Sequence, residues 1–301
     1  MSGRIGLVLS GGGAKGAYEI GVYKALTAMG ADAYIDTIAG TSVGALNAVL
    51  LDSRGAEYSE KIWNNLKITD MLNPDKKRLT KIPALPDYSD PDFVGIKPDN
   101  FFDSIVLNSM SFFKSIRKDN VVNDFLKDGL PFNQEKIADL IDQHVDFSHI
   151  YKRIYVICSD SNGDPKSFEL NKYTPQTQKK IILASSALPI VYTGASGVEI
   201  NGECYFDGGV SGNKSNTPVS YLYNNGYKSI IAVHLKYDAD ITSQYKMRDA
   251  DIINIIPSRD LGGFMSGTLN LNQKKIQSDI EMGYNDTIGH IKEISRMINS
   301  L

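Results

Sequence analysis

Short apolar runs alternate with amphipathic segments along the first part of the chain, and this alternation predicts an α/β fold. Ile5–Leu9 is continuously apolar, as expected for a strand that is buried on both faces. Residues 17–29 then carry apolar side chains at helical spacing, and Gly30 follows as a C-terminal cap. A second apolar run, Tyr34–Ala39, comes next. Strands that alternate with helices in this way are typical of a mostly parallel sheet.

The same reasoning predicts elements along the rest of the chain. A strand pair is expected at Arg153–Cys158 and Ser167–Leu170, and a hairpin at Val198–Phe206 with Asn201-Gly202 as its type I′ turn. We expect buried strands at 229–235 and 251–256, and helices at 57–66, 137–145, 175–185 and 216–226. From Leu269 a single long helix closes the chain, with a buried stripe made of Ile276, Ile280, Ile291, Ile294 and Ile298.

An insert of different character interrupts these elements. Residues 73–99 are rich in proline and charge and predict an irregular loop. Phe101–Ile116 then combines aromatic and aliphatic residues in an amphipathic, helical pattern. Two interpretations stay open for this segment: a cap over an apolar site that turns toward a lipid surface, or a helix packed on the sheet.

Composition narrows the class of protein. The chain has 301 residues, of which 42% are hydrophobic, and its formal net charge of -3 gives no basic field for nucleic acid. Two cysteines, Cys158 and Cys204, are too few for a disulfide framework. We find neither a signal-peptide pattern nor an apolar stretch near the ~20 residues of a membrane span. A cytoplasmic protein is therefore expected, while peripheral membrane contact and export by a route without a signal peptide stay open.

One turn carries a pattern typical of a nucleophilic serine. Gly40-Thr41-Ser42-Val43-Gly44 follows an apolar run and leads into a helical Ala/Leu/Val run. A G-x-S-x-G sequence between a strand and a helix is the context of a nucleophile elbow, in which a sharp turn exposes the serine hydroxyl. The same pattern is also compatible with an ordinary serine at a helix N-terminus.

The first glycine loop has three interpretations, one of which is a structural turn without a function. Gly11-x-Gly13-x-x-Gly16 matches a dinucleotide-binding fingerprint, and Asp36 lies where a ribose-binding acid is expected. A nicotinamide- or flavin-dependent oxidoreductase is therefore the rival hypothesis. Against it, the second strand continues past Asp36 to the Ser42 turn. Three consecutive glycines also offer unhindered N–H groups that suit an oxyanion.

A nucleophilic serine needs a base, and the sequence offers two. His234 lies at the end of a buried strand, so that an Asp207–His234 pair would give an α/β-hydrolase type of triad. A histidine in such a position is more often hydrogen-bonded and structural. The other candidate is Asp207 itself, which ends a strand and precedes two glycines.

Four blocks in this order resemble those of the bacterial patatin-like phospholipases: residues 11–16, 40–44, 184–189 and 207–209. The resemblance implies a three-layer α/β/α fold with a mostly parallel central sheet, and a Ser–Asp dyad that uses neither metal nor cofactor. Ser42 would be the nucleophile and Asp207 the general base. The N–H groups of Gly11, Gly12 and Gly13 would form the oxyanion hole, with Lys15 beside it. The remaining motif glycines are Gly16, Gly40, Gly44, Gly208 and Gly209.

The resemblance also implies the organisation and the activity. Residues 5–221 would form the catalytic region, with a variable cap insert at about 67–130, and residues 222–301 would complete the same domain. The expected activity is lipid acyl hydrolysis of phospholipase A, lysophospholipase or carboxylesterase type, through an acyl-enzyme that releases a fatty acid. The expected partners are a lipid ester and, transiently, a membrane or micelle surface. The ester, the acyl position and the oligomeric state stay open.

Overall fold

The computed structural model describes residues 4–67, 70, 73–74, 132–188 and 197–301. Most of the expected cap insert, including the aromatic segment Phe101–Ile116, lies outside these ranges. At its borders, β3 (Asn73–Pro74) pairs antiparallel with β4 (Phe132–Asn133).

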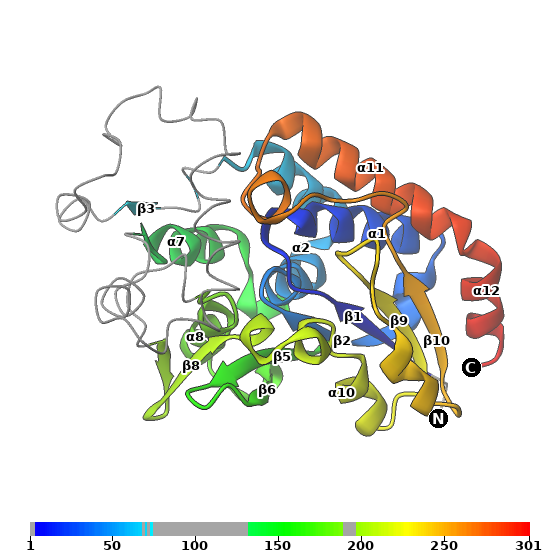
Figure 1. Cartoon of the computed structure of the whole chain (residues 1–301), viewed down its shortest axis with the longest axis horizontal. Coiled ribbons are helices and arrows are strands. Elements are labelled where there is room, and N and C mark those ends of the chain that lie inside the picture. Colours follow the sequence, from blue (N-terminus) through cyan, green and yellow to red (C-terminus); the bar gives the residue numbers. More distant parts are fainter. Residues whose placement is uncertain (1–3, 68–69, 71–72, 75–131, 189–196) are drawn as a thin grey trace, which may run out of the picture.

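The central sheet has eight strands in the order β10-β9-β1-β2-β5-β8-β7, with β6 paired to β5 (Figure 1). The pairs among β10, β9, β1, β2 and β5 are parallel, whereas β6, β7 and β8 pair antiparallel. The expected mostly parallel sheet is confirmed. The strands are β1 (Ile5–Leu9), β2 (Ile35–Thr41), β5 (Arg153–Asp160), β6 (Pro165–Glu169), β7 (Val198–Ile200), β8 (Glu203–Asp207), β9 (Ser229–Val233) and β10 (Asp251–Ile255).

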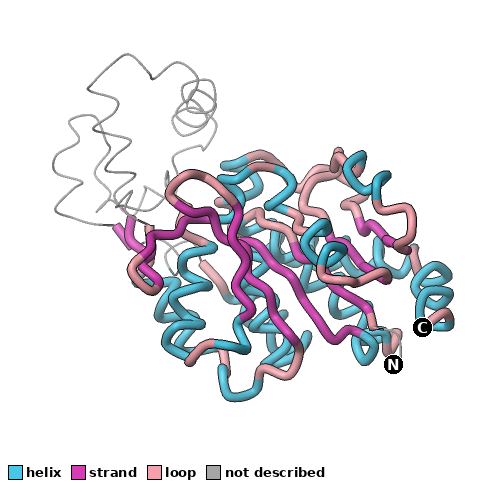
Figure 2. The backbone as a smooth tube through the Cα atoms, turned by 90° about the horizontal axis from the view of Figure 1, so that it is seen from below, coloured by secondary structure: helices cyan, strands magenta, loops and turns pink. Residues whose placement is uncertain are grey.

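Helices cover both faces of the sheet. Leu7 and Leu9 of β1 point into a large core with α1, α2, α8 and α11, whereas Val8 packs in a smaller core with Leu222 of α10. Because alternate residues of a strand face opposite sides of the sheet, β1 is buried on both faces. Figure 2 shows the strands side by side with helices around them. The helices are α1 (Ala17–Ala28), α2 (Val43–Asn65), α7 (Glu135–His144), α8 (Pro175–Ser185), α9 (Asn213–Asn216), α10 (Val219–Asn224), α11 (Gln273–Gly289) and α12 (Ile291–Asn299).

Helices α1 and α11 approach each other closely through glycines. A Cβ at Gly21 would lie 1.9 Å from the carbonyl oxygen of Ile280, and one at Gly283 would lie 2.1 Å from that of Tyr18. The Tyr18 hydroxyl, in turn, donates to Asp286 Oδ2 at 2.9 Å. The C-terminal helix is thereby fixed on the helix that follows the glycine loop.

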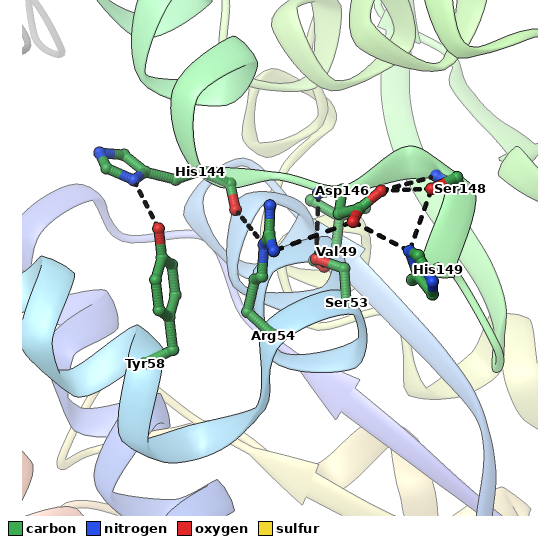
Figure 3. Close-up of polar contacts among 8 residues, drawn as sticks. All are labelled: Val49, Ser53, Arg54, Tyr58, His144, Asp146, Ser148 and His149. Carbon is green, nitrogen blue, oxygen red and sulfur yellow. Dashed lines mark hydrogen bonds and ion pairs between the residues drawn. The ribbon is translucent and has the colours of Figure 1, made fainter.

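The connector between α7 and β5 is held on the middle of α2 (Figure 3). Arg54 Nε donates to the carbonyl oxygen of His144 at 3.2 Å, and its Nη1 lies 3.8 Å from Asp146 Oδ2. One turn later, the Tyr58 hydroxyl is hydrogen-bonded to His144 Nδ1 at 3.0 Å. These contacts flank Gly55, whose φ of 78° kinks the helix. The α2 kink therefore has polar partners on both sides.

Three of the predicted helices differ from the observed ones. The segment predicted at 216–226 is divided between α9, which ends at Asn216, and α10, which covers only Val219–Asn224. The segment predicted at 57–66 is the second half of α2, which runs from Val43 through the kink at Gly55. The predicted single C-terminal helix is broken at His290, whose ψ of 10° is not helical, just after the poor helix former Gly289. The break changes the direction of the row of apolar side chains, so Ile291 is 44% exposed instead of buried.

Candidate active site

The Ser42 turn has the backbone of a sharp strand-to-helix junction. Strand β2 ends at Thr41, α2 begins at Val43, and Ser42 between them has a φ of 54°. A Cβ at Gly40 would lie 2.5 Å from the carbonyl oxygen of Gly44. One at Gly44 would lie 2.4 Å from that of Leu9. The turn can close this tightly because both flanking positions lack a side chain.

Ser42 makes two polar contacts that fix its orientation. Its Oγ donates to Asp207 Oδ2 at 2.7 Å, across a separation of 165 residues. Its backbone N–H donates to Ser185 Oγ at 2.9 Å, and Ser185 Oγ donates onward to the carbonyl oxygen of Ile157 at 2.6 Å. The strained residue is therefore held through both its side chain and its backbone.

Strand β5 brings Asp207 next to the turn. In the sheet register, Thr41 lies opposite Ile157, and Asp207 lies opposite Cys158. Gly208 completes the close approach, because a Cβ there would lie 2.4 Å from the carbonyl oxygen of Ile157. The last residues of β2 and β8 are thus placed by two successive residues of one strand.

The Asp207 carboxyl is buried and accepts two hydrogen bonds. Oδ2 accepts from Ser42, and Oδ1 accepts from the Gly209 N–H at 2.7 Å. Burial raises the pKa of Asp207 to about 6, and these two hydrogen bonds oppose the rise. At neutral pH the group is mostly ionised but more basic than an ordinary aspartate, which suits a proton acceptor.

The glycine loop lies beside Ser42, and its N–H groups are not equivalent. The Gly11 N–H donates to the carbonyl oxygen of Asn216 at 3.0 Å, while Asn216 Nδ2 donates to the Gly11 carbonyl oxygen at 3.1 Å. Within the described part of the chain, the N–H groups of Gly12 and Gly13 have no such acceptor. Of the three expected oxyanion donors, Gly11 is therefore engaged by Asn216, whereas Gly12 and Gly13 keep N–H groups without a partner in the described part of the chain.

Lys15 and Gly16 end this loop. Lys15 is partly buried, and burial lowers the pKa of its ammonium group. Gly16 lies against the nucleophile helix, since a Cβ there would be 2.5 Å from Val43 Cγ2. The loop is consequently packed directly on the first turn of α2.

The family of the chain follows from comparison with known proteins. A family model described as patatin-like phospholipase matches residues 7–223. The chain belongs to this family. It is a family of lipid-hydrolysing enzymes, which sets the coarse class of activity.

A solved structure of low sequence identity has a similar fold. VipD from Legionella pneumophila matches with a TM-score of 0.53 at 14% identity, over 97% of this chain and 67% of VipD. The type III effector protein ExoU matches with a TM-score of 0.46 at 16% identity, over 98% of this chain and 53% of ExoU. The likeness to VipD supports the patatin-like arrangement of sheet and helices. No curated protein matches the chain by sequence.

In this patatin-like protein, His234 is part of a network away from Ser42. Its Nε2 is hydrogen-bonded to Asn254 Oδ1 at 2.7 Å, and burial lowers the pKa of its imidazole. Gln244 holds the same Asn254 amide by two further bonds. No histidine of the described ranges is hydrogen-bonded to Ser42 or Asp207. The contacts therefore favour the arrangement without histidine.

The contacts of Asp36 do not support the rival interpretation of a dinucleotide-binding site. Asp36 is ion-paired with Arg4 at 3.0 Å, and β2 continues beyond it to Thr41. Over the described ranges, no three His, Cys, Asp or Glu side chains gather as metal ligands. Nor is any helix in those ranges long and apolar enough to cross a membrane.

Two residues that contact the site had no assigned role in the sequence analysis. Ser185 and Asn216 both lie in or near the family blocks, but their partners Ser42 and Gly11 are 143 and 205 residues away. The only sequence signal for Ser185 and Asn216 was their position in or near the family blocks. Their partners could not be derived from spacing.

Proposed function

We propose that this chain is a lipid acyl hydrolase that uses Ser42 as nucleophile and Asp207 as general base, through an acyl-enzyme. The observation that carries the proposal is the 2.7 Å hydrogen bond from Ser42 Oγ to Asp207 Oδ2. An activated serine requires a base within about 2.6–3.2 Å, and Asp207 meets this requirement without a histidine.

In the first half-reaction, Asp207 accepts the proton of Ser42 while Oγ attacks the ester carbonyl carbon. The resulting tetrahedral oxyanion collapses, and the bond to the alcohol breaks. Protonated Asp207 returns the proton to the leaving alkoxide, so an alcohol departs and the acyl group stays on Ser42. A pKa of about 6 suits both the acceptance and the return of the proton.

In the second half-reaction, water replaces the alcohol. Asp207 accepts a proton from water as its oxygen attacks the acyl carbon. Collapse breaks the bond to Ser42 Oγ, which regains the proton from Asp207, and a fatty acid is released. Asp207 thus alternates between base and acid in each half.

The oxyanion is assigned to the N–H groups of Gly12 and Gly13, together with the N-terminus of α2. Gly11 takes a different role from the one expected, because its N–H already donates to Asn216. We assign Gly11 and Asn216 to holding the loop in place. Lys15, partly buried at the end of the loop, adds positive charge beside it.

We infer further that residues 5–221 and 222–301 form one domain. Ile231 of β9 and Ile276 of α11 belong to the same core cluster as Leu7 of β1 and Val49 of α2. The lipid ester, and any transient contact with a membrane or micelle surface, remain part of the proposal. So does the cap role of residues 67–130, most of which lie outside the described ranges.

Labelling with a fluorophosphonate, which reacts with activated serines, tests the proposal. The wild-type protein should be labelled, and folded Ser42→Ala should not. A panel of phospholipid, lysophospholipid and acylglycerol esters then identifies the substrate. Equal labelling of Ser42→Ala would overturn the assignment. Micromolar nicotinamide or flavin binding by an unlabelled wild-type protein would instead support the dinucleotide rival.

A further inference from the structure

A fully buried carboxyl group lies behind the site, between the glycine loop and the nucleophile helix. Glu19 of α1 has no exposed surface. Its Oε2 accepts from Asn47 Nδ2 of α2 at 2.8 Å, and the Ser10 backbone amide also faces the carboxyl. Ser10 directly precedes the three glycines, and Asn47 lies five residues after Ser42. Glu19 therefore contacts both structures that the proposed chemistry needs.

Asn47 extends this contact in two directions. Its Nδ2 also donates to the carbonyl oxygen of Gly16 at 3.0 Å, so the end of the glycine loop joins the network. Its Oδ1 accepts from Trp63 Nε1 at 3.0 Å. The amide thus has partners for both hydrogens and for its oxygen, and its orientation is fixed.

Within the described ranges, no positively charged side chain is paired with Glu19. The charged side chains of α1 and α11 have other partners. Lys24 pairs with Glu60, Lys275 pairs with Asp279, and Asp286 accepts a hydrogen bond from Tyr18. Lys15 and Asp52 also lie on the elements around α1, and among the described residues neither is hydrogen-bonded or ion-paired to Glu19.

The burial of Glu19 has two consequences for its charge. Oε1 is buried and has no hydrogen-bond partner among the described residues. An unpaired, buried carboxylate oxygen is costly, so the neutral acid is favoured. Burial raises the pKa of Glu19 to about 8.

We propose that Glu19 is a positioning residue that fixes the glycine loop against the helix beginning at Ser42. The proposal deepens the proposed function and rests on it. As a neutral acid, Glu19 joins Ser10, Asn47 and, through Asn47, Gly16. Once ionised, it would place a negative charge next to the loop whose N–H groups are to stabilise an oxyanion. Turnover should therefore fall as Glu19 ionises.

The pH profile of turnover separates this role from simple packing. Wild-type kcat should fall above about pH 8, because burial raises the pKa of Glu19 to about 8. Glu19→Gln keeps the shape and stays neutral, so it should retain kcat at pH 7 and lose this alkaline limb. Glu19→Ala should lower kcat roughly tenfold at pH 7, which corresponds to about 1.4 kcal/mol of lost positioning, and it should lack the alkaline limb because it has no carboxyl group. Glu60→Gln, a change on the surface of α2, should leave the profile unchanged.

A measurement without substrate distinguishes failure of this inference from failure of the proposed function. Between the ordinary pKa of 4.5 and the raised value of about 8, the unfolded chain holds fewer protons than the native protein. The stability of the wild type therefore falls as pH rises through this window, and the Tm of Glu19→Gln should increasingly exceed it. An alkaline limb that persists in Glu19→Gln, or equal Tm curves for both proteins, would overturn the inference. Turnover by Ser42→Ala would instead refute the proposed function and leave the Tm test valid.

Discussion

Thr41 and Asp207 pair with successive residues of β5, Thr41 with Ile157 and Asp207 with Cys158. Hydrogen-bonded strands, rather than mobile loops, therefore set the separation between the Ser42 turn and the Asp207 carboxyl. The 2.7 Å contact between Ser42 Oγ and Asp207 Oδ2 follows from this register. Preorganisation of this kind lowers the cost of aligning nucleophile and base.

The pKa of Asp207 predicts an acid limb in the reactivity of Ser42. The base must be ionised to accept a proton, and burial raises its pKa to about 6. The rate of fluorophosphonate labelling should therefore fall as pH decreases through about 6, and reach a plateau above pH 7. The measurement is the pseudo-first-order labelling rate between pH 4.5 and 8. A rate that stays constant across this range would contradict the assigned base.

Ser185 should matter more than its neighbour Ser186. Ser185→Ala removes the acceptor of the Ser42 backbone N–H, and an unsatisfied buried donor costs about 1–3 kcal/mol. Stability and kcat should both decrease, as measured by urea unfolding and by turnover. Ser186 Oγ donates to the carbonyl oxygens of Ile182 at 3.1 Å and Leu183 at 3.2 Å and accepts from Gln134 Nε2 at 3.5 Å. It makes no hydrogen bond to Ser42 in the described part of the chain, so Ser186→Ala is the matched control. Equal effects of the two changes would argue against support of Ser42 by Ser185.

Gly283 and Gly289, both in α11, differ in how much space surrounds them, because α1 packs closely against Gly283. A Cβ at Gly283 would lie 2.1 Å from the Tyr18 carbonyl oxygen, whereas one at Gly289 has nothing within 4 Å. Gly283→Ala should lower the free energy of unfolding by about 1–3 kcal/mol, as overpacking does. Gly289→Ala should change it by less than about 0.5 kcal/mol. Urea denaturation compares them directly, and a Gly283→Ala protein as stable as Gly289→Ala would contradict the close helix contact.

Short sequence patterns predicted much of the fold, because nearby residues specify helices, strands and tight turns. The helix at Pro175–Ser185 has the predicted bounds, and the hairpin turn has Asn201 and Gly202 at φ of 54° and 87°. The kink at Gly55 and the break at His290 were missed, because apolar periodicity shows that a helix continues but not how its axis turns.

The candidate site was predicted only in part for a different reason. Ser42, Asp207 and the glycine loop lie in short motifs that can be read directly. The engagement of the Gly11 N–H by Asn216 joins residues 205 positions apart, and no spacing rule shows it. The sequence pattern does not show that Glu19 is buried, because its burial depends on how α1 packs against α2.

The central claim is that Asp207, and no histidine, activates Ser42. It is tested most directly by comparing kcat of Asp207→Asn and His234→Gln on one soluble ester, after confirming that both proteins fold. Loss of a general base costs about 10²–10⁴ in rate, so Asp207→Asn should lose this much. His234 bonds Asn254 rather than Asp207, so His234→Gln should keep nearly full kcat. A folded His234→Gln protein as inactive as Asp207→Asn, or an Asp207→Asn protein with wild-type kcat, would contradict the claim.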